Sequence, residues 1–163
     1  MAYLFFYTST VAALILFLII CTLRELRLEN IIIGLTTVGY SLVHDVLLGD
    51  HFKLFYYIAP ASSTLFMIIS AGLLYPFLNM TYTMFLPGRF KHAMIYTACW
   101  ILAMLMFEHA SILTKTVVFT GWVPIPWSLV IYLFTYAWIY LFYRFLLKKG
   151  EQEPSRQNPD AGS

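Results

Sequence analysis

The sequence predicts an all-α membrane protein in which five transmembrane helices form one bundle. Of its 163 residues, 61% are hydrophobic and only 11% are charged, whereas an ordinary soluble domain carries about 25% charged residues. The chain also contains five long apolar segments, and a helix needs roughly 20 apolar residues to cross a bilayer. Because a soluble chain this short could not bury so many apolar side chains, we expect the lipid bilayer to be its solvent.

Polar breaks divide the apolar sequence into spans. The expected spans are about 2–22, 30–48, 54–78, 93–113 and 127–147. The first is expected to be a retained helix, because nothing basic precedes Arg24 and its apolar run exceeds the about 7–15 residues of a signal peptide. Residues 1–149 would then form the bundle. Residues 150–163 are polar and are expected to form a disordered cytoplasmic tail.

The basic residues predict the orientation of the bundle. Eight of the ten Lys and Arg residues fall on the side that holds the loops after spans one and three and the C-terminal tail; only Lys53 and Lys115 fall on the other. By the positive-inside rule, the N-terminus is outside and the C-terminus is inside. The sequence has no basic stripe with interleaved aromatic residues, so we expect no nucleic-acid partner.

Four ionisable residues near the outer ends of spans two and four are the main candidates for function. They are His44 with Asp45, and Glu108 with His109. Counted from the preceding basic residues at ~1.5 Å per residue, both carboxylates lie roughly 25–27 Å into a ~30 Å hydrocarbon core. Adjacent helical residues point about 100° apart, so at most one member of each pair is expected to face the bundle interior.

The segment between spans four and five adds two further candidates. Lys115 stands slightly further out than Glu108, and Trp122 lies in a turn rich in Gly and Pro. Gly121 is expected to serve this turn because glycine permits a positive φ. Aromatic residues of this region could line a pocket, although interfacial belts are their commoner role; they are Trp122, Trp127, Tyr132 and Tyr136.

Ionisable residues within spans are costly and usually face a partner or a water-filled cavity. The polar cluster therefore allows a purely structural scaffold, in which Glu108 pairs with Lys115 or His44, and Asp45 with His109. We favour a non-enzymatic protein that binds a small ligand or a proton, or that acts as a subunit of a membrane complex. A homo-oligomer is a further expectation for so small a bundle.

An intramembrane enzyme is the third hypothesis. Asp45 and Glu108 could protonate a lipid or isoprenoid, and Trp122 or Trp127 could stabilise the resulting carbocation. Histidine and carboxylate are also ligands of zinc and iron. No HxH, HExxH or CxxC spacing occurs in the sequence, so we expect no metal and no cofactor.

The two polar pairs fit the pattern of a weak internal repeat. Each copy contains a basic anchor, a histidine beside an acid, and a proline that enters the next helix: Arg27, His44 and Pro60, then Lys91, His109 and Pro126. Two helical hairpins related by an axis along the membrane normal would produce this pattern. Alternating spans could also produce it by chance.

The second half of the chain resembles a known family. The residues that carry the likeness are Leu74-Tyr75-Pro76, Asn79-Met80, Phe107-Glu108, Gly121-Trp122 and Trp127-Ser128, together with His44-Asp45. In these features the chain resembles small five-helix membrane proteins of endospore-forming bacteria, a family without an assigned activity. The resemblance implies a multi-pass protein of the bacterial plasma membrane and no particular catalytic residue.

Overall fold

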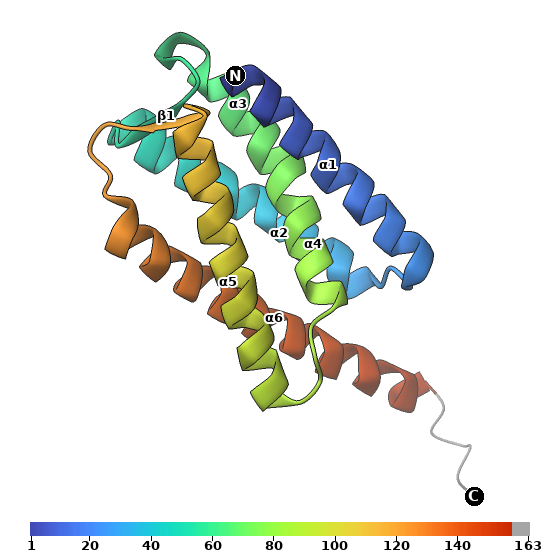
Figure 1. The fold of residues 1–163 in the computed structure, drawn as a ribbon. Coiled ribbons are helices and arrows are strands. Elements are labelled where there is room, and N and C mark those ends of the chain that lie inside the picture. Colours follow the sequence, from blue (N-terminus) through green and yellow to red (C-terminus); the bar gives the residue numbers. More distant parts are fainter. Residues whose placement is uncertain (158–163) are drawn as a thin grey trace, which may run out of the picture.

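The computed structural model describes residues 1–157 and is built almost entirely of helices (Figure 1). Its elements are α1 (Ala2–Leu23), α2 (Leu28–Asp45), a π-helical turn (Val46–His51), β1 (Phe55–Tyr57), a 3₁₀ turn (Pro60–Ser62), α3 (Ser63–Ile69), a second π-helical turn (Ser70–Leu74), α4 (Tyr75–Met84), α5 (Phe90–Leu113), β2 (Val117–Phe119) and α6 (Pro124–Gln157). The all-α prediction is confirmed.

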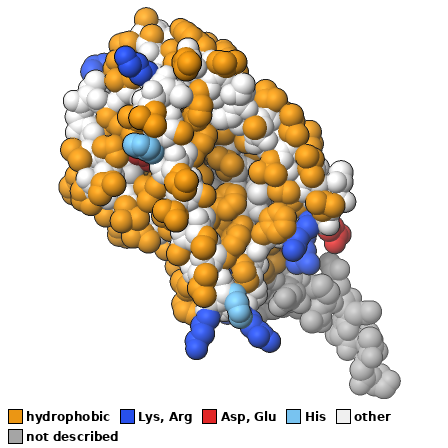
Figure 2. Space-filling model, in the orientation of Figure 1, with side chains coloured by type: hydrophobic (Ala, Val, Ile, Leu, Met, Phe, Trp, Pro, Cys, Tyr) orange, Lys and Arg blue, Asp and Glu red, His pale blue; other side chains and the backbone are white. Residues whose placement is uncertain are grey.

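Five helical segments of the described residues are long and apolar enough to cross a membrane. They are Ala2–Leu23, Leu28–His51, Pro60–Met84, Phe90–Leu113 and Pro124–Gly150. Four agree with the expected spans to within one helical turn. In Figure 2, hydrophobic side chains cover most of the visible face, and Lys and Arg side chains gather at its two ends. This distribution is what a multi-pass membrane protein requires.

The structure differs from the expectation at the third span, which begins at Pro60 and not near Leu54. Residues Phe55–Tyr57 form β1, which pairs antiparallel with β2. Aromatic and β-branched residues suit a strand as well as a bilayer, so hydropathy alone assigned this stretch to the helix. Positive φ angles at Lys53, Ile58 and Lys115 turn the chain beside the two strands.

The strands and the N-terminus lie at the same end of the bundle, which we call the strand end (Figure 1). The hydroxyl of Thr116 donates to the carbonyl of Ala2 at 3.2 Å, so the start of α1 is held beside β2. The helix α6 is assigned to Gln157 and thus includes the first residues of the expected tail. Residues 158–163, the rest of that tail, lie outside the described residues.

Hydrogen bonds between side chains connect four helices in the bundle interior. Trp100 of α5 donates to the Tyr136 hydroxyl of α6 at 2.8 Å, and that hydroxyl donates to Asn79 of α4 at 3.2 Å. The amide of Asn79 then donates to Thr37 of α2 at 3.2 Å. Because lipid is as apolar as a leucine side chain, interhelical hydrogen bonds and close packing hold transmembrane helices together.

The packing of α2 against α4 yields a testable prediction. A Cβ at Gly34 would lie 2.7 Å from the Met80 sulfur, whereas a Cβ at Gly39 of the same helix meets nothing within 4 Å. Gly34→Leu should therefore lower the free energy of unfolding by about 1–3 kcal/mol through overpacking, and Gly39→Leu should leave it nearly unchanged. Thermal unfolding in detergent measures both, and equal losses would contradict this packing.

Candidate functional site

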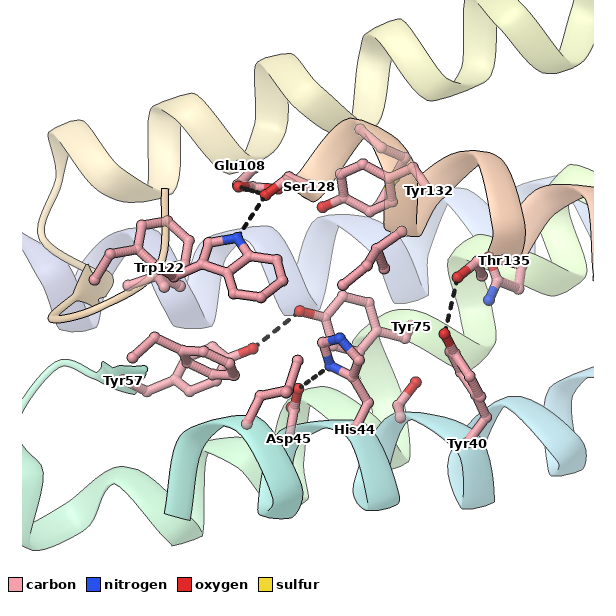
Figure 3. A pocket seen from close by; sticks show the side chains of 18 of the residues that line it. Tyr40, His44, Asp45, Tyr57, Tyr75, Glu108, Trp122, Ser128, Tyr132 and Thr135 are labelled. Carbon is pink, nitrogen blue, oxygen red and sulfur yellow. Dashed lines mark hydrogen bonds and ion pairs between the residues drawn. The ribbon is translucent and has the colours of Figure 1, made fainter. Parts of the chain in front are cut away.

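A cavity of about 130 Å³ lies at the strand end, between α2, α4, α5 and α6 (Figure 3). Its cover comes from the two strands, through Phe55 and Tyr57 of β1 and through Val117 and Phe119 of β2. The strand pair thus covers one side of a space that is still partly open. The remaining walls are helical and carry most of the polar groups.

Asp45 contributes a buried carboxylate to the cavity lining. Its side chain is buried, with 3% of the residue exposed, and Oδ1 lies 3.4 Å from Nδ1 of His44. Among the described residues, Oδ2 of Asp45 and Nε2 of His44 are buried polar atoms without a hydrogen-bond partner. The hydroxyl groups of Tyr57 and Ser70 lie near the carboxylate but form no hydrogen bond to Oδ2. Burying a carboxylate without full pairing is costly, so this pair is open to a further partner from the cavity.

Glu108 lies on the opposite wall from Asp45 (Figure 3). Its Oε1 accepts a hydrogen bond of 2.6 Å from the Ser128 hydroxyl, and that hydroxyl accepts one of 3.0 Å from the Trp122 indole. A short hydrogen bond to a carboxylate is among the stronger kinds. The three residues therefore fix the segment before α6 against α5 and hold the indole at the cavity.

Two pairs of hydroxyl groups complete the polar lining. Tyr57 and Tyr75 share a hydrogen bond of 2.9 Å, and Tyr40 and Thr135 share one of 3.1 Å. Burial raises the pKa of the Tyr57 hydroxyl well above its ordinary value, and the negative charge of Asp45 raises it further. Tyr57 therefore keeps its proton at neutral pH and can act as a donor.

The electrostatic character of the cavity is acidic and aromatic. Two carboxylates and one imidazole line it, and no Lys or Arg is among the lining residues. The aromatic lining residues are Tyr40, Phe55, Tyr57, Tyr75, Phe119, Trp122, Tyr132 and Tyr136. Because aromatic faces and carboxylates both attract positive charge, this lining favours a cation over an anion.

The structure brings four of the six predicted site residues to this cavity: His44, Asp45, Glu108 and Trp122. His109 and Lys115 are exposed and do not line it. The expectation that only one residue of each pair faces inward is met by Glu108 with His109. The expectation is wrong for His44 and Asp45, because both residues line the cavity and the imidazole lies 3.4 Å from the carboxylate.

The expected pairings of Glu108 with Lys115 or His44, and of Asp45 with His109, are not found among the described residues. The same part of the chain contains no group of three or more His, Cys, Asp or Glu side chains placed to hold a metal ion. Gly121 does not adopt a positive φ. Its missing side chain instead permits close packing, because a Cβ there would lie 3.1 Å from Leu54.

The sequence analysis did not identify Ser128, Tyr75 or Asn79 as lining residues. Ser128, Tyr132 and Tyr136 recur every four residues on α6, and Tyr75 and Asn79 show the same spacing in the third span. Residues four apart share one face of a helix, so this spacing could have identified them. Of the aromatic residues named from the sequence, Tyr132 and Tyr136 line the cavity, whereas Trp127 is exposed.

Comparisons of the chain with protein-family models, with curated proteins and with solved structures found no match. The resemblance noted in the sequence thus stays a prediction. The function has to be inferred from the cavity and its chemistry.

The bridge at Ser128 yields a prediction about stability. Ser128→Ala should lower the free energy of unfolding by about 1–3 kcal/mol, because it leaves the Trp122 indole without its acceptor. Ser111→Ala is the matched control: Ser111 is also buried but bonds only to the Phe107 carbonyl of its own helix, so its loss should be smaller. Chemical unfolding in detergent compares the two, and a larger loss at Ser111 would contradict the bridging role.

Proposed function

We propose that this protein binds a small organic cation, in exchange with a proton, in the cavity beside Asp45. The observation that carries the proposal is the buried Oδ2 atom of Asp45, which has no hydrogen-bond partner among the described residues. A carboxylate in such a place is neutralised either by a proton or by a positively charged ligand. The two states exclude each other, so ligand and proton compete for one group.

The walls of the cavity support the choice of ligand class. Tyr57, Tyr75 and Trp122 place aromatic rings between Asp45 and Glu108 (Figure 3). Aromatic rings stabilise ammonium groups by about 0.5–2 kcal/mol each, most strongly where water is excluded. The two carboxylates supply the opposite charge. An alkylammonium ion satisfies both kinds of surface, whereas an anion satisfies neither.

The size of the cavity limits the ligand. Its volume of about 130 Å³ is close to that of an engineered cavity of ~150 Å³ that binds benzene. The ligand, or the part of it that enters, is therefore no larger than a single ring or a tetramethylammonium ion. The imidazole of His44 lies 3.4 Å from the Asp45 carboxylate, and its ring nitrogens can donate or accept the exchanging proton.

The orientation of the protein is part of the proposal. Eight of the ten basic residues belong to the end opposite the strands or to the C-terminal tail, which favours the N-terminus outside and the C-terminus inside. The cavity would then lie near the outer face of a bacterial plasma membrane. A homo-oligomer or a larger membrane complex is compatible with this role.

The two rival hypotheses have less support. A scaffold whose polar residues only lock the helices would have them paired without adjacent space, and the cavity and the free oxygen of Asp45 count against it. An enzyme that protonates an isoprenoid is favoured by a deep apolar pocket that ends at the acids, whereas a cavity of about 130 Å³ would hold only the reacting end of such a substrate.

The central prediction concerns Asp45. Purified protein in detergent should bind radiolabelled tetramethylammonium saturably, and Asp45→Asn should weaken the affinity at least about tenfold, equivalent to about 1.4 kcal/mol. Lowering the pH should also weaken binding to the wild type, because protonation removes the negative charge of the carboxylate. Sodium at equal ionic strength should not compete.

The matched control for this prediction is Asp50→Asn. Asp50 is at the same end of the bundle, accepts a hydrogen bond of 3.2 Å from Thr64, and does not line the cavity. Its variant should bind tetramethylammonium as the wild type does. Equal losses in the two variants, or no saturable binding by the wild type, would overturn the proposal.

Glu108 offers a prediction that separates charge from structure. In Glu108→Gln the amide oxygen can still accept from Ser128, so the free energy of unfolding should change by less than about 1 kcal/mol. The loss of negative charge should nevertheless weaken tetramethylammonium binding. If the affinity matches that of the wild type, Glu108 has no part in the site.

A further inference from the structure

A second cavity, of about 600 Å³, lies at the end of the bundle opposite the strands. It forms where α1 ends, α2 begins, α4 ends and α6 passes, and its lining includes Leu23, Thr83, Gly88 and Leu147. This cavity shares no lining residue with the one beside Asp45. Inferences about it are therefore independent of the proposed function.

The charge of the second cavity is opposite to that of the first. Arg24, Arg27 and Arg144 all line it, and Glu25 is the one acidic residue in the lining. Arginine stays charged at every physiological pH. No ion pair between any of the three guanidinium groups and a carboxylate occurs within the described part of the chain. Three like charges gathered from two chain segments favour an anion between them.

Two contacts fix the position of the Arg24 guanidinium group at this cavity. Its Nη1 donates to the Met84 carbonyl at 3.3 Å, and its guanidinium carbon lies 4.6 Å from the centre of the Phe85 ring. These contacts hold one arginine in place across the end of α4. An arginine that served only as a membrane anchor would instead extend towards the lipid headgroups.

Buried polar groups form the floor of this cavity. The Asn30 amide donates to the Thr83 hydroxyl at 2.9 Å and to the Tyr143 hydroxyl at 3.5 Å, and its Oδ1 accepts from the Arg27 backbone N–H at 3.1 Å. Because the Tyr143 oxygen acts as an acceptor in this network, its own proton remains to be donated. The floor therefore presents a donor beside the three guanidinium groups.

We propose that this cavity binds a phosphate group that carries a net negative charge, as phosphatidylglycerol and inorganic phosphate do and phosphatidylcholine does not. Guanidinium groups bind phosphate through two parallel hydrogen bonds, and basic pockets between transmembrane helices bind the headgroups of anionic lipids. A volume of about 600 Å³ accommodates a phosphodiester with its glycerol as readily as a free phosphate ion. Both sources offer the same chemistry to the arginines, and the experiment below distinguishes them.

The test uses thermal unfolding of the full chain in a neutral detergent, with phosphatidylglycerol, phosphatidylcholine or inorganic phosphate added in turn. Phosphatidylglycerol should raise the midpoint of unfolding by several degrees more than phosphatidylcholine does. Arg27→Gln and Arg144→Gln should each remove at least half of that difference. If millimolar inorganic phosphate gives the same protection, the ligand is a soluble phosphate and the site stands.

The matched control is Arg89→Gln, which removes a positive charge at the same end of the bundle from an exposed residue outside the cavity. This variant should keep the full difference between the two lipids. Should either cavity variant fail to fold, native mass spectrometry of the wild type should still show a retained phosphatidylglycerol that phosphatidylcholine cannot replace. The proposal is overturned if phosphatidylglycerol, phosphatidylcholine and inorganic phosphate all raise the midpoint of unfolding equally. It is also overturned if Arg89→Gln removes as much of the difference between the two lipids as the cavity variants do.

Discussion

The antiparallel pairing of β1 with β2 is the interaction on which the candidate site depends. It joins the connection between α2 and α3 to the connection between α5 and α6, two loops about 60 residues apart in sequence. Backbone groups near a bilayer must find partners within the protein, and pairing the two strands satisfies them in both loops at once. As a result Asp45, at the end of α2, and Glu108, on α5, face one covered space.

The cavity can persist only because the helices around it are fixed by other contacts. The hydrogen-bonded chain from Trp100 through Tyr136 and Asn79 to Thr37 connects α5, α6, α4 and α2. Tyr136 and Asn79 also line the cavity, so the groups that hold the helices are the groups that shape its base. This hydrogen-bonded arrangement keeps the walls from moving inward onto Asp45. Without it, inward movement of the walls would fill the space at the lowest cost in free energy.

Hydropathy predicted the number and position of the spans because crossing a bilayer imposes a length and a composition on each helix. It could not separate Phe55–Tyr57 from the third span, since an aromatic run is equally apolar as a strand. Counting residues from the basic anchors also predicted that Asp45 and Glu108 lie at one level of the bundle, and both line the same cavity. The cavity itself could not be predicted, because it depends on helix rotation, on the π-helical turns beside Asp45 and Tyr75, and on contacts between residues far apart in sequence.

The weak internal repeat stays a prediction. Its two copies share the order of helix, strand and helix, but they differ in the order of acid and histidine. Each hairpin carries one strand between its helices, and these two strands are the ones that pair. The order of acid and histidine is reversed between the copies, and one residue turns a helical side chain by about 100°. Hence both carboxylates face the cavity, whereas only His44 of the two histidines does. The cavity thus has two acids and one imidazole in its lining, and the proposed binding of a cation rests on this excess of acidic groups.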